Sequence, residues 1–134
     1  MSIKNIGLLC SLSLLTACQI ISPVFVDYNG VRRDVATWIN QQTLLSMQQK
    51  RSLAQLSKAQ QKLVRIEKIE QQQKFEIAKE NSIALHCAQQ HLTAHKITQL
   101  QEKVFGKDQQ QHILTVYAQQ FPQLKLDVSQ IKCE

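Results

Sequence analysis

The apolar residues between Val31 and Phe105 recur at the spacing of a helix. This stretch contains neither glycine nor proline and is rich in good helix formers. One apolar stripe runs through residues separated by seven, eleven and seven positions: Trp38, Leu45, Leu56 and Leu63. The pattern predicts a first helix from Asp34 to about Glu80, roughly 70 Å long if unbroken. Glu70–Lys74, five polar residues in a row, is the expected place for a bend or turn.

The stripe is not that of a regular heptad coiled coil, because glutamines interrupt it at positions 42, 49 and 60. A second helix is predicted to start at Asn81–Ser82, a weak N-cap, and to continue to Phe105. Its apolar residues are Leu85, Leu92, Ile97 and Leu100. Gly106 is a good residue for the position just past a helix end.

A third helix is predicted from Asp108, because the sequence Asp108–Gln111 resembles a capping box. It should end near Gln120, since Pro122 cannot continue the amide ladder. Beyond it, apolar and polar residues alternate, which favours an extended tail. The predicted fold is therefore all-α: a single domain over residues 34–134, built as a long helical hairpin with a shorter third helix and an extended C-terminal tail.

The N-terminal residues have the layout of a secretory signal. Lys4 is followed by an uncharged apolar run, Ile6–Leu15, and by the small residue Ala17. An uncleaved membrane anchor is the alternative, because no charge occurs between Lys4 and Asp27. Pro23 and the basic pair at positions 32 and 33, just beyond the far end of such a span, disfavour it. Either route exports the remainder of the chain.

The segment Leu15-Thr16-Ala17-Cys18 resembles the lipobox of bacterial lipoproteins. The resemblance covers the first 18 residues only, and the family of the mature domain is not recognised. It implies that residues 1–17 are a signal peptide and that Cys18 receives a diacylglycerol and an N-acyl group, with residues 18–33 as a tether. The residue after Cys18 is Gln19 and not aspartate, and in this respect the chain is similar to lipoproteins at the periplasmic face of the outer membrane. The anchor alternative would leave a periplasmic domain on the inner membrane.

Four cysteines occur in the chain. If Cys10 leaves with the signal and Cys18 carries lipid, Cys87 and Cys133 remain as one pair in an oxidising compartment, where a disulfide is expected. Closing a loop of about 46 residues would stabilise the fold by roughly 4 kcal/mol in the chain-entropy model. The bridge would pin the end of the tail to the second helix.

The formal net charge of +6 suits anionic partners such as lipid headgroups, lipopolysaccharide, cell-wall polymer or acidic proteins. The basic residues are spread along the chain and few aromatic residues lie among them, so nucleic acid is not an expected partner. The alternative is an ordinary solvated helical surface.

One group of residues has the chemistry of metal ligands: His86, Cys87, His91 and His95. Three of them recur at four-residue intervals, so neighbours in the series would share one face of a helix. A disulfide would remove Cys87 from that set and leave His86, His91 and His95 as the candidate ligands. The alternative is that these histidines form an ordinary solvated helix face.

The sequence contains no glycine-rich phosphate loop, nucleophile elbow or recognisable carboxylate pair. We therefore expect no enzymatic activity, no small-molecule substrate and no cofactor beyond the covalent lipid. The expected function is that of a lipid-anchored adaptor or assembly factor for another envelope protein, with the membrane as second partner. Small helical pilotin lipoproteins are similar in size and anchor, although no residue motif links them to this chain. The alternatives are a periplasmic metal-binding protein and a lysis-type lipoprotein.

Overall fold

The structure is a computed structural model that describes residues 26–134. The predicted signal peptide, the lipobox and Cys18 lie outside the described residues. Within them, the fold is all-α and contains no strand. The elements are α1 (Arg33–Asn40), α2 (Met47–Gln61), the 3₁₀ turn η1 (Ile66–Lys68), α3 (Gln71–His91), α4 (Ala94–Phe105), α5 (Lys107–Gln120) and the 3₁₀ turn η2 (Val128–Gln130).

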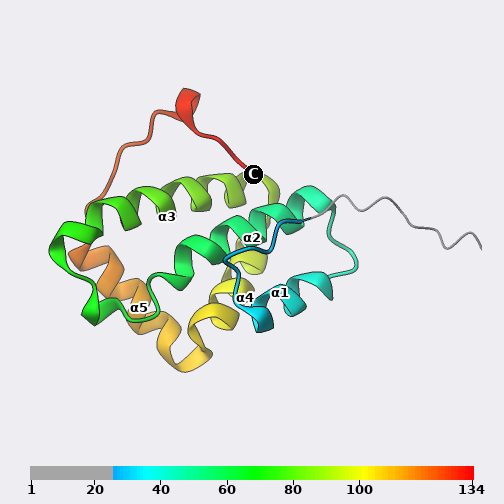
Figure 1. The fold of residues 1–134 in the computed structure, drawn as a ribbon, viewed down its shortest axis with the longest axis horizontal. Coiled ribbons are helices and arrows are strands. Elements are labelled where there is room, and N and C mark those ends of the chain that lie inside the picture. Colours follow the sequence, from blue (N-terminus) through cyan, green and yellow to red (C-terminus); the bar gives the residue numbers. More distant parts are fainter. Residues whose placement is uncertain (1–25) are drawn as a thin grey trace, which may run out of the picture.

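The helix α2 lies at the centre of the bundle. It packs against α3 on one side and against α1 and α4 on the other (Figure 1). Its apolar residues Leu53, Leu56 and Ala59 are almost completely removed from solvent. The helices α2 and α3 run side by side as a hairpin (Figure 1). The sequence also predicted a helical hairpin, but with arms over residues 34–80 and 81–105.

The first arm of that hairpin is not one long helix, which corrects the prediction. It is interrupted at residues 41–46 and again at residues 62–70. The first break ends at a capping box: Ser46 Oγ accepts from the Gln49 amide at 3.2 Å, and Gln49 Oε1 accepts from the Ser46 amide at 2.9 Å. The breaks let the chain fold back, and Trp38, Leu45, Leu56 and Leu63 still contact one core.

The turn between α2 and α3 lies earlier than predicted. Gln71–Lys74 form the first turn of α3, and Glu70 is its N-cap, with its amide donating to Gln73 Oε1 at 3.3 Å. The predicted helix start at Asn81–Ser82 is wrong, since both residues lie inside α3 and Asn81 is buried. The chain breaks instead at Leu92–Thr93, where Leu92 is buried and Thr93 Oγ1 accepts from the Lys96 amide.

Two helix ends lie where the sequence put them, because local backbone constraints decide them. The helix α4 ends at Phe105, before Gly106 at φ 82°, and α5 ends at Gln120, before Pro122. The predicted capping box at Asp108 does not form: Gly106 is the N-cap of α5, and Asp108 lies in the first turn. An acidic residue there still interacts favourably with the helix dipole.

Residues 26–32, which the sequence assigned to the tether, pack against the helices. Val26 is buried. Gln61 holds the segment from α2, because its side chain accepts from the Arg32 amide at 2.7 Å and donates to the Gly30 carbonyl at 2.8 Å. The packed body of the protein therefore begins no later than Val26.

Candidate functional site

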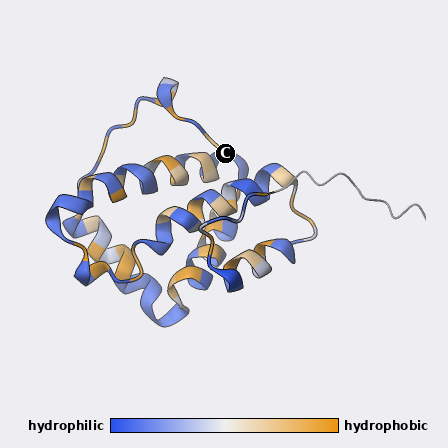
Figure 2. Ribbon diagram, in the orientation of Figure 1, coloured by the Kyte–Doolittle hydropathy of each residue, from blue (hydrophilic) through white to orange (hydrophobic). Residues whose placement is uncertain are grey.

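The C-terminal tail, residues 121–134, stands away from α3 and returns to it at its end (Figure 1). Residues of the tail and of α3 line a common cavity. We call this cavity of about 310 Å³ the tail cleft. Its lining comes from α3, with Phe75, Lys79 and Ile83, and from the tail, with Leu124, Lys125, Leu126, Asp127, Gln130 and Ile131. Hydrophobic and hydrophilic residues alternate along the tail (Figure 2). Residues 122–127 belong to no helix or strand, and the 3₁₀ turn η2 then interrupts the extended tail that the sequence predicted.

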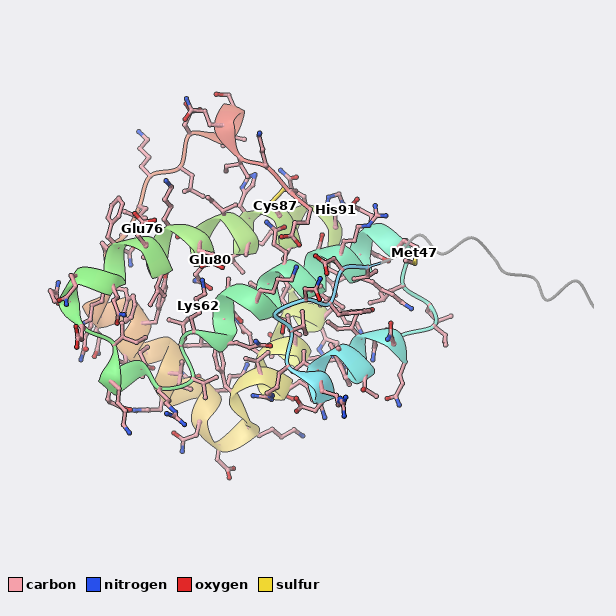
Figure 3. All side chains as sticks on the ribbon, in the orientation of Figure 1. Met47, Lys62, Glu76, Glu80, Cys87 and His91 are labelled. Atoms are coloured by element: carbon pink, nitrogen blue, oxygen red, sulfur yellow. A yellow bond between two sulfur atoms is a disulfide. The ribbon has the colours of Figure 1, made fainter. Side chains whose placement is uncertain are left out.

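The far end of the tail is covalently fixed to α3. Cys87 and Cys133 form the expected disulfide, with 5.5 Å between their Cα atoms, and Cys87 is fully buried (Figure 3). Polar contacts add to it from α2: Gln48 Nε2 donates to the Glu134 carbonyl at 2.9 Å, and Lys58 Nζ lies 3.1 Å from Glu134 Oε2. This end of the tail is thereby tied to two helices.

The near end is held by packing. Phe121 is buried and stacks on Tyr117 with 4.9 Å between ring centroids, and Lys74 Nζ lies 5.4 Å from the Phe121 centroid. Because both ends are fixed, the middle of the tail is held as a bridge over α3. The cleft beneath it is a feature of the folded chain.

The tail cleft combines an apolar floor with a positive rim. Phe75, on α3, leaves 53% of its surface exposed, and Val128 beside the cleft leaves 61% exposed. The rim carries two cations, Lys79 and Lys125, and one carboxylate, Asp127, whose Oδ1 accepts from the amide and the hydroxyl of Ser129 at 3.1 and 2.7 Å. The rim is therefore positive by one formal charge.

A second cavity, of about 460 Å³, lies between α2 and α3 and shares Lys79 and Ile83 with the tail cleft. Its walls carry charges of both signs. Lys62 and Glu80 point toward each other across it and form an ion pair (Figure 3). Glu76, on the same wall of α3, has no ion-pair partner among residues 26–134.

The histidines of the predicted metal set do not share a helix face. His91 is the last residue of α3, and His95 lies in the first turn of α4, after the break at Leu92–Thr93. His86 contacts Gln90, with 2.9 Å between their side-chain nitrogens, and Cys87 is in the disulfide. In the described part of the chain, no three His, Cys, Asp or Glu residues are grouped so that they could hold a metal ion.

Sequence reasoning found the tail and its disulfide but not the cleft. Phe75 directly follows the polar run Glu70–Lys74, and nothing in that pattern connects it with residues 124–131. The one available signal was the alternation of apolar and polar residues in the tail.

Among the helices of residues 26–134, none has both the length and the hydrophobicity that crossing a bilayer needs. No protein-family model, no curated protein sequence and no solved structure matches the chain.

Proposed function

We propose that this chain is a lipid-anchored, non-enzymatic adaptor of the bacterial envelope that binds a protein partner in the tail cleft. The observation that carries the proposal is the tail itself, fixed at both ends over an apolar cleft in which Phe75 is half exposed. Exposed apolar surface of this kind is typical of interaction sites.

The disulfide supports a location outside the cytoplasm, because such bonds persist in oxidising compartments. The resemblance of Leu15-Thr16-Ala17-Cys18 to a lipobox supplies the anchor. Several acyl chains on Cys18 would hold the protein stably on a bilayer, whereas a single chain binds reversibly. The periplasmic face of the outer membrane is the location that Gln19 favours.

The rim of the cleft indicates the chemistry of the partner. Its cations Lys79 and Lys125 outnumber its one carboxylate, Asp127, and the floor is formed by aliphatic and aromatic side chains. A matching occupant is a protein segment that presents one or two apolar side chains with an acidic residue beside them. The apolar side chains would supply the binding energy, and the ion pairs would set the orientation.

The anchor is tested in cells with a clickable fatty-acid analogue. We expect the analogue on the wild-type protein and not on the Cys18→Ala variant, and we expect intact-mass analysis to show a chain that begins at Cys18 and carries acyl groups. A retained N-terminal segment without fatty acid would refute the lipoprotein assignment.

The docking site is tested with a photo-crosslinking residue placed at Phe75 or, as a matched control, at Leu44, which is 98% exposed in the loop between α1 and α2. We expect a discrete envelope protein to crosslink from position 75 and not from position 44. Equal products from both positions, or none from position 75, would overturn the proposal.

Charge reversal distinguishes specific docking from random capture. Lys79→Glu should remove the crosslink from position 75, because it reverses a rim charge. Lys107→Glu makes the same change at an exposed position of α5 that does not line the cleft, and it should leave the crosslink intact. A crosslink that survives Lys79→Glu would show that the rim charge does not select the partner.

A further inference from the structure

Six of the basic residues of the folded body lie along one strip of its surface. Three shallow cavities of about 570, 520 and 680 Å³ adjoin one another there: the first two share Arg32, and the last two share Lys62 and Arg65. Their basic lining residues, which we call the basic strip, are Arg32, Arg33, Lys62, Arg65, Lys68 and Lys103. Only two acidic residues, Asp34 and Glu76, line the same cavities.

Most of the strip's charge is free. Arg32 is paired with Asp34 at 2.6 Å, and Lys62 is paired with Glu80. The other four residues have no ion-pair partner within residues 26–134, and the one acidic residue between Lys62 and Lys68, Glu67, lies 2.5 Å from His112. Residues 47–69, which include half of the strip, hold six basic residues and one acidic residue.

The strip adjoins the segment that leads to the proposed anchor. Gly30, Val31 and Arg32 line its middle cavity together with Val64, an apolar side chain that is 39% exposed. Val26 is eight positions after Cys18. At roughly 3.3 to 3.6 Å per residue, that length of chain spans less than about 30 Å even when fully extended. A body anchored at Cys18 therefore remains close enough to touch the bilayer.

We propose that the basic strip binds the anionic phospholipid headgroups of the bilayer in which Cys18 is anchored. This inference rests on the proposed lipid anchor. Electrostatic attraction between exposed charges acts only over about 8 Å at physiological ionic strength, so the short chain from Cys18 supplies the proximity that the four unpaired cations need. None of the residues that line the tail cleft belongs to the strip, so the cleft stays available for its protein partner.

The test measures the reactivity of individual lysines in the intact protein. Protein purified from membranes is reconstituted into vesicles of phosphatidylcholine alone or of an equimolar mixture of phosphatidylcholine and phosphatidylglycerol. The rate of amine acylation at each lysine is then read by peptide mass spectrometry. We expect Lys62, Lys68 and Lys103 to react several-fold more slowly in the anionic vesicles, while Lys107, Lys125 and Lys132 react at the same rate in both.

Salt and charge reversal separate lipid contact from other causes of protection. Ionic strength of about 1 M shortens the screening length to about 3 Å and should restore the reactivity. The variant Arg65→Glu/Lys68→Glu should lose the protection of Lys62 and Lys103, whereas Lys107→Glu/Lys132→Glu, with the same change in net charge, should keep it. Equal reactivity in both kinds of vesicle would overturn the proposal.

Acylation of the protein is measured separately, from the intact mass of the same sample. An acylated protein with unprotected strip lysines would overturn the strip proposal alone, and a protein without acyl groups would overturn the anchor. If Arg65→Glu/Lys68→Glu abolished the crosslink from position 75 and left the vesicle protection unchanged, the strip would be a protein-binding surface instead.

Discussion

Arg32 Nη1 donates a 3.0 Å hydrogen bond to the carbonyl oxygen of Val104, although the two residues are 72 positions apart. Arg32 Nη2 donates to the neighbouring Lys103 carbonyl at 2.9 Å. The last carbonyls of a helix have no partner within it, so the guanidinium caps the C-terminal end of α4. The first residues of the described chain are thereby fixed to the fourth helix.

The Arg32→Ala variant should lower the free energy of unfolding by roughly 1 to 3 kcal/mol, because it removes hydrogen bonds from a charged donor. Urea denaturation followed by circular dichroism measures the change. Arg33→Ala is the matched control, since its side chain is exposed and has no ion-pair partner among the described residues. Equal losses for the two variants would contradict a capping role for Arg32.

Acid should weaken the contact between Arg32 and Asp34. The hydrogen bond from Arg32 lowers the pKa of the Asp34 carboxyl, as does the positive charge of the guanidinium. A carboxyl with a lowered pKa in the folded state stabilises the fold above its unfolded pKa, and this stabilisation is lost as the pH falls through the folded pKa. Unfolding measured from neutral to acidic pH should therefore show a smaller acid-induced loss in Asp34→Asn than in the wild type.

The Arg32→Ala variant should reduce the same acid dependence, because it removes the group that lowers the pKa of Asp34. An unchanged pH profile in both variants would show that this pair does not contribute to acid stability. The pKa of the Glu67 carboxyl is also lowered, chiefly by its hydrogen bond with His112, so both variants should keep some acid dependence.

Reduction of the disulfide should destabilise the fold. With 46 positions between Cys87 and Cys133, the chain-entropy model gives a loss of roughly 4 kcal/mol. Thermal unfolding with and without a dithiol reductant measures it. The variant Cys87→Ser/Cys133→Ser should unfold at the temperature of the reduced wild type and should not respond to the reductant.

The core depends on large apolar residues of α2. Leu56 is fully buried, so Leu56→Ala should cost about 2 to 5 kcal/mol through the lost burial and the cavity left behind. The same substitution at Leu44, which is 98% exposed, should change the stability little. Denaturant midpoints of the two variants test this difference, and a large loss in Leu44→Ala would mean that the loop packs more closely than described.

The turn between α4 and α5 requires glycine. Gly106 has φ 82° and ψ 143°, a backbone conformation that is open essentially to glycine alone. Space is not the constraint, since an added Cβ would meet no atom within 4 Å. Gly106→Ala should therefore cost about 1 to 3 kcal/mol through backbone strain. Lys107→Ala, one position later and inside α5, is the control that should have little effect on thermal unfolding.

Individual helix boundaries show how far local sequence rules reach. As predicted, α4 ends before Gly106 and α5 ends before Pro122, because glycine and proline each constrain their own backbone whatever surrounds them. The capping box at Ser46 was overlooked, since Ser46 and Gln49 lie in a stretch whose apolar periodicity alone fits a continuous helix. Asn81 fits a helix N-cap in sequence, yet it is buried in the middle of α3.

The candidate sites depend even less on local sequence. His91 and His95 have the spacing of one helix face, but burial of Leu92 and capping by Thr93 place them on different helices. Phe75 and Leu124 line one cleft because the disulfide and the packing of Phe121 return the tail to α3. The basic strip joins residues near positions 32, 65 and 103 because α1, α2 and α4 pack against one another.

The sequence by itself determined the all-α class and the ends of α4 and α5, because helix propensity, glycine and proline act on neighbouring residues. It also determined the pairing of Cys87 with Cys133, because only two cysteines follow position 18. Only the tertiary structure decided where the long first arm breaks, which side chains line the tail cleft and which cations gather in one strip. Those features depend on the burial of apolar residues far apart in the chain, and that burial outweighs local helix preference.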